Sequence, residues 1–388
     1  MRRLIAVIFC ICAVCAAIFC KIEAAEIVVS SAPELHAALK QLQPGTTVLI
    51  APGMYDGWFL LKRVVGAPDA PVRVQAQFPD NPPVFHHHAE SLHLSDCAYV
   101  TLKSLIVEGQ ASNGVNIDDG GTYETPSHHI VVEDVTIRNV GPVGNHDGLK
   151  LSGVTDFRVS RCRIEGWGGS AIDMVGCVRG VIEECEFRGK KGFSQMNGVQ
   201  AKGGAREIVI QTSRFYDAGA RAVQLGGRTE LVTFRPTVKP YEATAIEVAG
   251  NRFFGGETPL AFVTADGGYA HHNTIFFPRR WALRILQETG LPSFPPCQNG
   301  RFEQNVILYD ARMTETVNIG PRTAPQSFTF ARNVWVRVDS AALPLLPSPE
   351  IDGQLLDKTD LDFSRLPEIV LNPPTRHLDA GAEAYRVP

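Results

Sequence analysis

The sequence predicts an all-β fold in which short strands stack as successive coils along one axis. Two series of strand-like segments recur through the chain and advance together. In the first series, apolar residues alternate with polar or small residues, as in "HDGLKLSG" and "NGVQAKGG". The second series contains segments such as "TDFRVSRCRIEG" and "REIVIQTSRFYD". Such alternation is typical of half-buried strands, and no helix-like segment separates the two series.

The spacing between equivalent residues gives the length of one coil. Lys150 and Asp173 are 23 residues apart, as are Cys162 and Cys185, and Asp173 is 27 residues from Gln200. A single coil cannot bury its inner face alone. Stacked coils share one continuous core, with neighbouring strands about 4.8 Å apart.

Equivalent turn positions support the stacking. In four late coils the position two residues before the last buried residue is asparagine: Asn251, Asn273, Asn305 and Asn333. Stacked side-chain amides can bond one another and the turn backbone, so we expect an asparagine ladder. Cys162 and Cys185 hold the same position in earlier coils, and we interpret them as small buried residues rather than as a disulfide.

The pattern resembles the right-handed parallel β-helix of the pectin-lyase-like superfamily over roughly residues 26 to 340. The opening "SAPELHAALKQLQPGTTVLIAPGMYDG" strengthens the resemblance, because Pro33 to Leu42 reads as a short amphipathic helix before a first strand. In that superfamily such a helix covers the open end of the core. A cap is physically required, since an open stack exposes apolar side chains and unpaired strand edges.

We predict three segments. Residues 1–25 read as a signal peptide, because Arg2 and Arg3 precede an apolar run from Leu4 to Cys20; an uncleaved membrane anchor is the alternative. Residues 26–342 form the β-helix, and the proline-rich residues 343–388 form an extension that packs on it. We therefore expect a secreted, periplasmic or cell-surface protein that does not contact the membrane after signal removal.

Composition excludes several classes of function. The chain carries 37 basic and 41 acidic residues, so no positive excess points to nucleic acid. Five of the nine cysteines remain after the signal, an odd and sparse set that is not a disulfide framework. We expect a monomer.

The outward face of the first strand series carries the candidate site. Coil over coil, one outward column reads Asn116, Lys150, Asp173, Gln200, Gln224, Ala261 and Arg284. Lys202 is the next outward residue after Gln200, two positions later on the same predicted strand. His146, Asp147 and Arg221 lie at the start of a predicted strand or just before it. Neighbouring glycines leave this wall open. A flat polar stripe suits a long repetitive glycan; the alternative is a solvated strand face with a surface ion pair worth about 0–1 kcal/mol.

Two branches of the superfamily resemble parts of this wall. "NHDGLKLSG" looks like the Asn-Thr-Asp-Gly segment of polygalacturonase-type glycoside hydrolases, with Asp147 at the position of a catalytic aspartate. "NGVQAKGGAREIVIQTSRF" resembles the alginate and chondroitin lyases, with Lys202 at the position of the catalytic lysine. That branch carries an arginine on the next coil, where this chain has Gly226 and, two residues later, Arg228.

The chemistry of β-elimination assigns roles to these residues. A uronate carboxylate must be neutralised, and a base must then remove the C5 proton. Lys202 and Lys150 are the base candidates, Arg221 is a charge neutraliser, and Asp147 and Asp173 are acid candidates or ligands for Ca²⁺. Residues expected to bind substrate are His146, Gln200, Gln224, Arg228, Arg284 and Trp281.

We interpret the sequence as an exported protein that acts on an acidic polysaccharide, with a lyase as the first hypothesis. An inverting glycoside hydrolase would use Asp147 and Asp173 at a separation of about 6.5–9.5 Å. A uronan C5-epimerase and a non-catalytic carbohydrate-binding or surface β-helix protein are the remaining alternatives.

Overall fold

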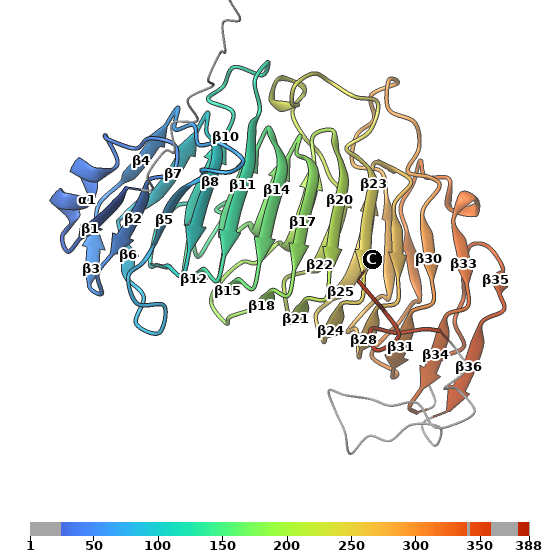
Figure 1. Cartoon of the computed structure of the whole chain (residues 1–388). Helices are drawn as coiled ribbons and strands as arrows, with labels where there is room; N and C mark the ends of the chain where they lie inside the picture. Colours follow the sequence, from blue (N-terminus) through green and yellow to red (C-terminus); the bar gives the residue numbers. More distant parts are fainter. Residues whose placement is uncertain (1–24, 340–341, 358–378, 388) are drawn as a thin grey trace, which may run out of the picture.

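The computed structural model describes residues 25–339, 342–357 and 379–387. The chain winds as a right-handed parallel β-helix, confirming the predicted fold class (Figure 1). Three parallel sheets run the length of the molecule. The apolar run of the predicted signal peptide lies outside the described residues. Within the described part, no helix is long and apolar enough to cross a membrane.

Sheet A contains 14 strands and sheet B contains 12. The strands of sheet A are β1 (Glu26–Val29), β2 (Thr47–Ile50), β5 (Val72–Ala76), β8 (Ala98–Lys103), β11 (Ser127–Glu133), β14 (Val154–Ser160), β17 (Val178–Glu183), β20 (Ala205–Gln211), β23 (Ala243–Ala249), β26 (Ala265–Asp266), β27 (Tyr269–His271), β30 (Arg301–Glu303), β33 (Thr329–Ala331) and β35 (Glu350–Ile351). The strands of sheet B are β3 (Met54–Asp56), β6 (Val84–His86), β9 (Ile106–Glu108), β12 (Thr136–Arg138), β15 (Arg163–Glu165), β18 (Glu186–Arg188), β21 (Arg214–Tyr216), β24 (Arg252–Phe254), β28 (Thr274–Phe276), β31 (Val306–Tyr309), β34 (Val334–Arg337) and β36 (Gln354–Asp357).

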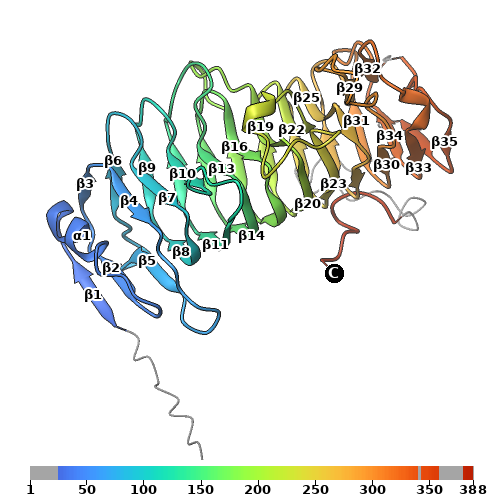
Figure 2. The same ribbon diagram turned by 90° about the horizontal axis from the view of Figure 1, so that it is seen from above.

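Sheet C contains ten strands and carries the candidate site. Its strands are β4 (Phe59–Lys62), β7 (Leu92–Ser95), β10 (Val115–Asp118), β13 (Leu149–Ser152), β16 (Ser170–Val175), β19 (Asn197–Lys202), β22 (Arg221–Gly226), β25 (Thr258–Val263), β29 (Leu283–Leu286) and β32 (Val317–Ile319). Figure 2 shows these strands following one another along the axis. Each coil therefore places one strand in sheet C, the next in sheet A and the next in sheet B.

The register of sheet C is the one that the alternation predicted. Lys150 pairs with Asp173, Asp173 with Gln200, and Gln200 with Gln224. Leu149 and Leu151 are buried in the core, at 0% and 1% exposure. Side chains alternate across a strand, so Lys150 between them points outward.

The core repeats the same residue types from coil to coil. The rings of Phe187, Phe215 and Phe253 stack with centroids 4.7 Å apart. The predicted asparagine ladder is confirmed: the backbone N–H and the side-chain amide of Asn251 both donate to Asn273 Oδ1, at 3.0 and 3.1 Å. Asn273 bonds Asn305 in the same way, and Asn305 bonds Asn333. Cys162 and Cys185 are buried free thiols, as expected.

The predicted cap helix is present but shorter than expected. Helix α1 spans Ala32–Ala38 at the N-terminal end of the stack and buries Leu35 and Ala38 in the core (Figure 1). Ser31 is its N-cap, accepting a hydrogen bond from Glu34 N at 3.4 Å. Two single-turn 3₁₀ helices, Leu231–Thr233 and Pro325–Ser327, lie in connections between strands.

The C-terminal segment continues the stack before it folds back. Strands β35 and β36 extend sheets A and B, so the solenoid includes part of the segment that we assigned to the extension. Residues 379–387 return to the side of the helix, where Tyr385 Oη donates to Gln211 Oε1 at 2.7 Å. Residues 358–378 of the extension lie outside the described part of the chain.

Candidate active site

Four charged side chains meet on the outward face of sheet C. Lys150 on β13 contacts Asp173 Oδ2 on β16, and its Nζ lies 3.4 Å from Asp147 Oδ2 in the turn before β13. Lys202, the last residue of β19, places its Nζ 3.3 Å from the same Asp173 oxygen. We call Asp147, Lys150, Asp173 and Lys202 the ion cluster. The predicted wall of Lys150, Asp173 and Lys202 therefore exists across three adjacent coils.

The two carboxylates lie beneath the two ammonium groups. Asp173 is 0% exposed although it holds an outward position on β16, and Asp147, in the turn before β13, is 1% exposed. Asp147 Oδ1 accepts a hydrogen bond from Ser170 N at 2.7 Å. A Cβ at Gly169 would lie 2.6 Å from the same oxygen, so the turn needs glycine there. Among the described residues, no group donates a hydrogen bond to Asp173 Oδ1.

Burial and neighbouring charges shift the pKa values of Asp147 and Lys150. Burial, with the nearby charge of Asp173, raises the pKa of Asp147 to about 6 against the opposing effect of Lys150. Burial alone would lower the pKa of Lys150, but the charges of Asp173 and Asp147 outweigh it and raise that pKa above its ordinary value. Lys150 therefore keeps its proton at neutral pH. It fits the role of a counter-charge better than the role of a base.

A groove of about 490 Å³ opens beside the ion cluster on sheet C. Its charged lining residues are Lys202, Arg221, Arg228, Arg284 and Glu288. Arg221 Nη1 pairs with Glu288 Oε1 at 3.0 Å and also donates to Gln224 Oε1. The four cations exceed the single acid, so this groove favours an anionic ligand.

Gln200 and Gln224 line the groove but mainly brace it. Each donates from Nε2 to the carbonyl of Gly226, both at 3.1 Å. Gln200 Oε1 accepts from Asn197 Nδ2 at 3.1 Å. Because their amides are buried and engaged, these residues hold neighbouring coils in place at the groove floor.

Of the other residues predicted to bind substrate, two line the groove and two do not. Arg228 and Arg284 line the groove, whereas Trp281 is buried, with its Nε1 donating to Glu315 Oε2 at 3.0 Å. The guanidinium of Arg284 lies 4.4 Å from the centre of the Trp281 ring. That ring thus orients Arg284 and does not offer a free face to a sugar. His146 lies in the turn beside Asp147 and is not among the residues that line the groove.

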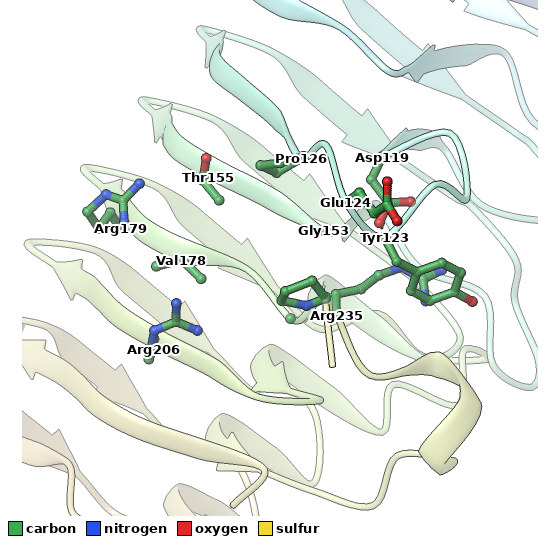
Figure 3. A pocket seen from close by; sticks show the side chains of 12 residues that line it. Asp119, Tyr123, Glu124, Pro126, Gly153, Thr155, Val178, Arg179, Arg206 and Arg235 are labelled. Carbon is green, nitrogen blue, oxygen red and sulfur yellow. The ribbon is translucent and has the colours of Figure 1, made fainter. Parts of the chain in front are cut away.

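An insertion between β22 and β23 contributes Arg228 to the lining of the groove. It leaves at Arg228 and returns at Glu242, whose carboxylate accepts from Gly203 N and from Thr229 N, both at 2.7 Å. A second cavity, of about 180 Å³, lies under the insertion. Figure 3 shows Arg235 reaching toward the opposite loop there: it pairs with Asp119 at 2.9 Å and stacks on Tyr123 at 3.7 Å. These contacts anchor the insertion against the coils.

The sequence reasoning missed a polar network that runs toward the N-terminus. Asp147 N donates to Asn113 Oδ1 at 2.7 Å, and Asn113 Nδ2 donates to Asn116 Oδ1 at 3.0 Å. Asn116 in turn donates to Glu90. Glu90 belongs to a second group on the same face, which we call the N-terminal patch: Trp58, Glu90, His93 and Asp118. Glu288, which pairs with Arg221, was also missed.

Calcium does not fit the ion cluster. Calcium takes six to eight oxygen ligands, whereas both carboxylates here already face ammonium groups. The unpartnered Asp173 Oδ1 supplies one oxygen atom. In the described part of the chain, no group of three or more His, Cys, Asp or Glu is placed to hold a metal ion. We therefore derive no step through calcium.

Comparisons with known proteins support the fold. Residues 90–276 match the family model described as a right handed beta helix region. A search of curated proteins found no match. A PL6 family polysaccharide lyase from Pseudopedobacter saltans is 13% identical, with 93% of this chain and 100% of that chain covered and a TM-score of 0.55. A GH136 lacto-N-biosidase from Eubacterium ramulus is 12% identical, with 87% and 67% covered and a TM-score of 0.54. At these identities, the similarity shows the fold.

Proposed function

We propose that the protein is a polysaccharide lyase that cleaves a uronic-acid-containing glycan by β-elimination in the sheet C groove. The observation that carries this proposal is the set of cations around the groove: Lys202, Arg221, Arg228 and Arg284. A uronate is an anion on an otherwise hydroxyl-rich ring. Guanidinium groups around the groove match the carboxylate of such a ring.

In the proposed reaction, Arg221 and Arg228 neutralise the uronate carboxylate, which makes the proton on C5 acidic. Lys202 faces the groove. Its neutral amine form, reached when the ammonium that pairs with Asp173 has released a proton, takes the C5 proton on Nζ. The electron pair of the C5–H bond becomes the C4–C5 double bond as the C4–O bond breaks. The departing oxygen takes up a proton from water. Lys150 remains an ammonium group that holds Asp147 and Asp173 in place.

An inverting glycoside hydrolase is the second candidate. It is favoured by the raised pKa of Asp147, because a pKa near 6 suits a carboxylic acid that donates a proton. Two features weigh against it. Both carboxylates contact the one nitrogen of Lys150, closer together than the about 6.5–9.5 Å of an inverting pair. Both are also buried, at 1% and 0% exposure.

The names of proteins with the same fold support an activity on carbohydrates without choosing the reaction. They include the polysaccharide lyase and the lacto-N-biosidase described above, and the PL6 family alginate lyase AlyGC. AlyGC is 12% identical at a TM-score of 0.50, with 93% of this chain and 59% of that chain covered. The choice of lyase therefore depends on the ion cluster and the groove. Export is part of the proposal and depends on the N-terminal apolar run.

The test is a substrate panel with two readouts. Pectate, alginate and unsulfated glycosaminoglycans are incubated with the protein, with and without a chelator. A lyase product absorbs in the near ultraviolet, and we expect that absorbance from the wild type with an initial rate that rises with pH. Lys202→Ala should lower the rate by at least about 100-fold, the usual scale for loss of a general base.

The matched control is Lys103→Ala. Lys103 lies on sheet A and pairs with Glu133 of the neighbouring coil. This substitution should leave the rate unchanged. New reducing ends without absorbance would establish a hydrolase instead. Exchange of the C5 hydrogen with deuterated solvent, without cleavage, would identify an epimerase. Binding without any of these signals would leave a carbohydrate-binding protein and overturn the proposal.

A further inference from the structure

The polar face of sheet C extends beyond the ion cluster to the N-terminal patch. Register places His93 beside Asn116, and Asn116 beside Lys150. From β16 back to β7 there are three strand spacings, or about 14 Å at about 4.8 Å each, and about 19 Å to β4. A glycan lying along the axis and held in the groove at one end would therefore pass over this patch.

The patch is built around a histidine between two carboxylates. His93 Nδ1 lies 3.0 Å from Glu90 Oε1, and Nε2 lies 2.6 Å from Asp118 Oδ2. Burial alone would lower the pKa of His93, but these two partners outweigh it and raise that pKa to about 9. The imidazolium charge is thus already matched by two carboxylates, and the three side chains together carry one net negative charge.

Trp58 gives the patch an aromatic face. Its side chain is 44% exposed, and its Nε1 donates to Glu90 Oε1 at 2.9 Å. The ring also meets His93 edge-on, with the centroids 6.1 Å apart. An exposed indole that is fixed by a hydrogen bond offers a preorganised flat surface. Such a surface suits the apolar face of a pyranose ring.

Charge separates this patch from the groove. The carboxylates of Glu90 and Asp118 can accept hydrogen bonds from sugar hydroxyls, but they repel the carboxylate of a uronate. Lys62 also points outward on β4, at the edge of the sheet, and no side chain in the described part of the chain pairs with it. Its exposed position leaves its charge largely solvated, so it offsets the acids only weakly.

We propose that the N-terminal patch binds an uncharged pyranose of the same polymer, with Trp58 stacking on the ring. The substrate would then be a heteropolymer that combines uronate with uncharged sugars, rather than a chain of uronate alone. This inference rests on the proposed function, because that function places the uronate in the groove.

The test is binding calorimetry in a Lys202→Ala background, which stops turnover. The probes are oligosaccharides of alternating uronate and N-acetylhexosamine prepared from unsulfated chondroitin, hyaluronan and heparosan, compared with homouronate oligosaccharides of equal length. We expect Trp58→Ala to weaken binding of at least one alternating probe by about tenfold. Binding of homouronates, and of alternating probes too short to reach β4, should change less than about twofold.

Control variants isolate the ring and the charge. Phe78→Ala removes an aromatic side chain of similar exposure, 53%, outside sheet C and should change nothing. Glu90→Gln should improve homouronate binding several-fold, because it removes repulsion at the patch. If Lys62→Ala weakens homouronates more than alternating probes, a uronate occupies the patch and the inference is wrong.

The outcomes are separable from those of the lyase assay. An equal effect of Trp58→Ala on both probe classes, no effect on either, or no binding of any alternating probe would overturn the inference. Calorimetry does not require cleavage, so a failed lyase assay leaves this result readable. A positive lyase assay with an unaffected Trp58→Ala variant would overturn the inference alone.

Discussion

The ion cluster and the N-terminal patch are two versions of one motif on the same sheet. In each, a cation lies between two carboxylates: Lys150 between Asp147 and Asp173, and His93 between Glu90 and Asp118. In each, one acid lies three residues before the cation, but the second acid differs in register. Asp173 pairs directly with Lys150, whereas Asp118 lies two residues beyond Asn116, the register partner of His93. The two motifs also differ in burial and in the charge around them.

The difference in burial decides how strongly each motif holds the fold. Asp147 and Asp173 have almost no solvent exposure, whereas the side chains of Glu90 and Asp118 are 18% and 31% exposed. A buried carboxylate that loses its partner carries a large desolvation penalty, whereas water screens a half-exposed one. The comparison teaches that a cation between two carboxylates can be buried in one part of a sheet and partly exposed in another.

The largest expected effect is from removing the central cation of the buried motif. Lys150→Met should lower the free energy of unfolding by about 3–5 kcal/mol, because it leaves buried Asp147 without its cation and leaves Asp173 with Lys202 alone. His93→Gln should cost less than half as much at pH 7. Urea denaturation measures both.

The control for this prediction is Lys103→Met, a cross-strand lysine whose pair with Glu133 is 38% and 23% exposed. Its expected cost is about 0–1 kcal/mol. Equal losses in Lys150→Met and Lys103→Met would show that burial does not set the cost of removing a paired lysine.

The next effect is on the pH dependence of stability, which should fall in two steps. The pKa of Asp147 is raised from 3.8 to about 6 in the folded state, so its contribution is full below pH 4 and is lost as pH rises through 6. The pKa of His93 is raised from 6.5 to about 9, so its contribution is full below pH 6.5 and is lost as pH rises through 9. The steps are worth at most about 3 kcal/mol for Asp147 and about 3.5 kcal/mol for His93, at about 1.4 kcal/mol for one pKa unit.

Variants assign the two steps. Asp147→Asn should remove the lower step and His93→Gln the upper one, when unfolding is measured by denaturant at pH 4, 6.5 and 9.5. A single step that neither variant changes would contradict the assignment.

The smallest effect concerns the rim of the groove. Arg228→Ala should weaken binding of an acidic oligosaccharide by about two- to fivefold at low salt, and by less at high salt, because a rim cation acts through a screened interaction. Calorimetry at two ionic strengths measures the difference. The same substitution should not change binding of a neutral oligosaccharide. If it does, Arg228 contacts the sugar ring rather than the carboxylate.

The sequence was enough to predict the fold and the meeting of Lys150, Asp173 and Lys202. Alternation sets which side chains point outward, and the coil length of 23 to 27 residues sets which ones become neighbours. The same spacing applies to His93, which lies 23 residues before Asn116 in "SLHLSDC", and this signal was overlooked. Extending the outward column that begins at Asn116 by one coil toward the N-terminus identifies His93.

Burial is what the spacing did not reveal. Asp173 occupies an outward position but is covered by Lys150 and Lys202, and this cover makes Lys150 a counter-charge instead of a base. Trp281 has the composition of a sugar-stacking residue but is held inside by Glu315 and two arginines. The ion pair between Arg221 and Glu288 depends on the path of the chain after β29. The local sequence pattern does not determine that path.

The winding of the chain also fixes the distance along the axis between residues on different coils. Each added turn lengthens the axis by one increment of about 4.8 Å and touches only the turns directly above and below it. Inserting a turn between β10 and β13 would therefore shift the tryptophan relative to the lysines by a whole increment while leaving both groups intact. In the proposed binding mode, the preferred length of the oligosaccharide would then change by a fixed step.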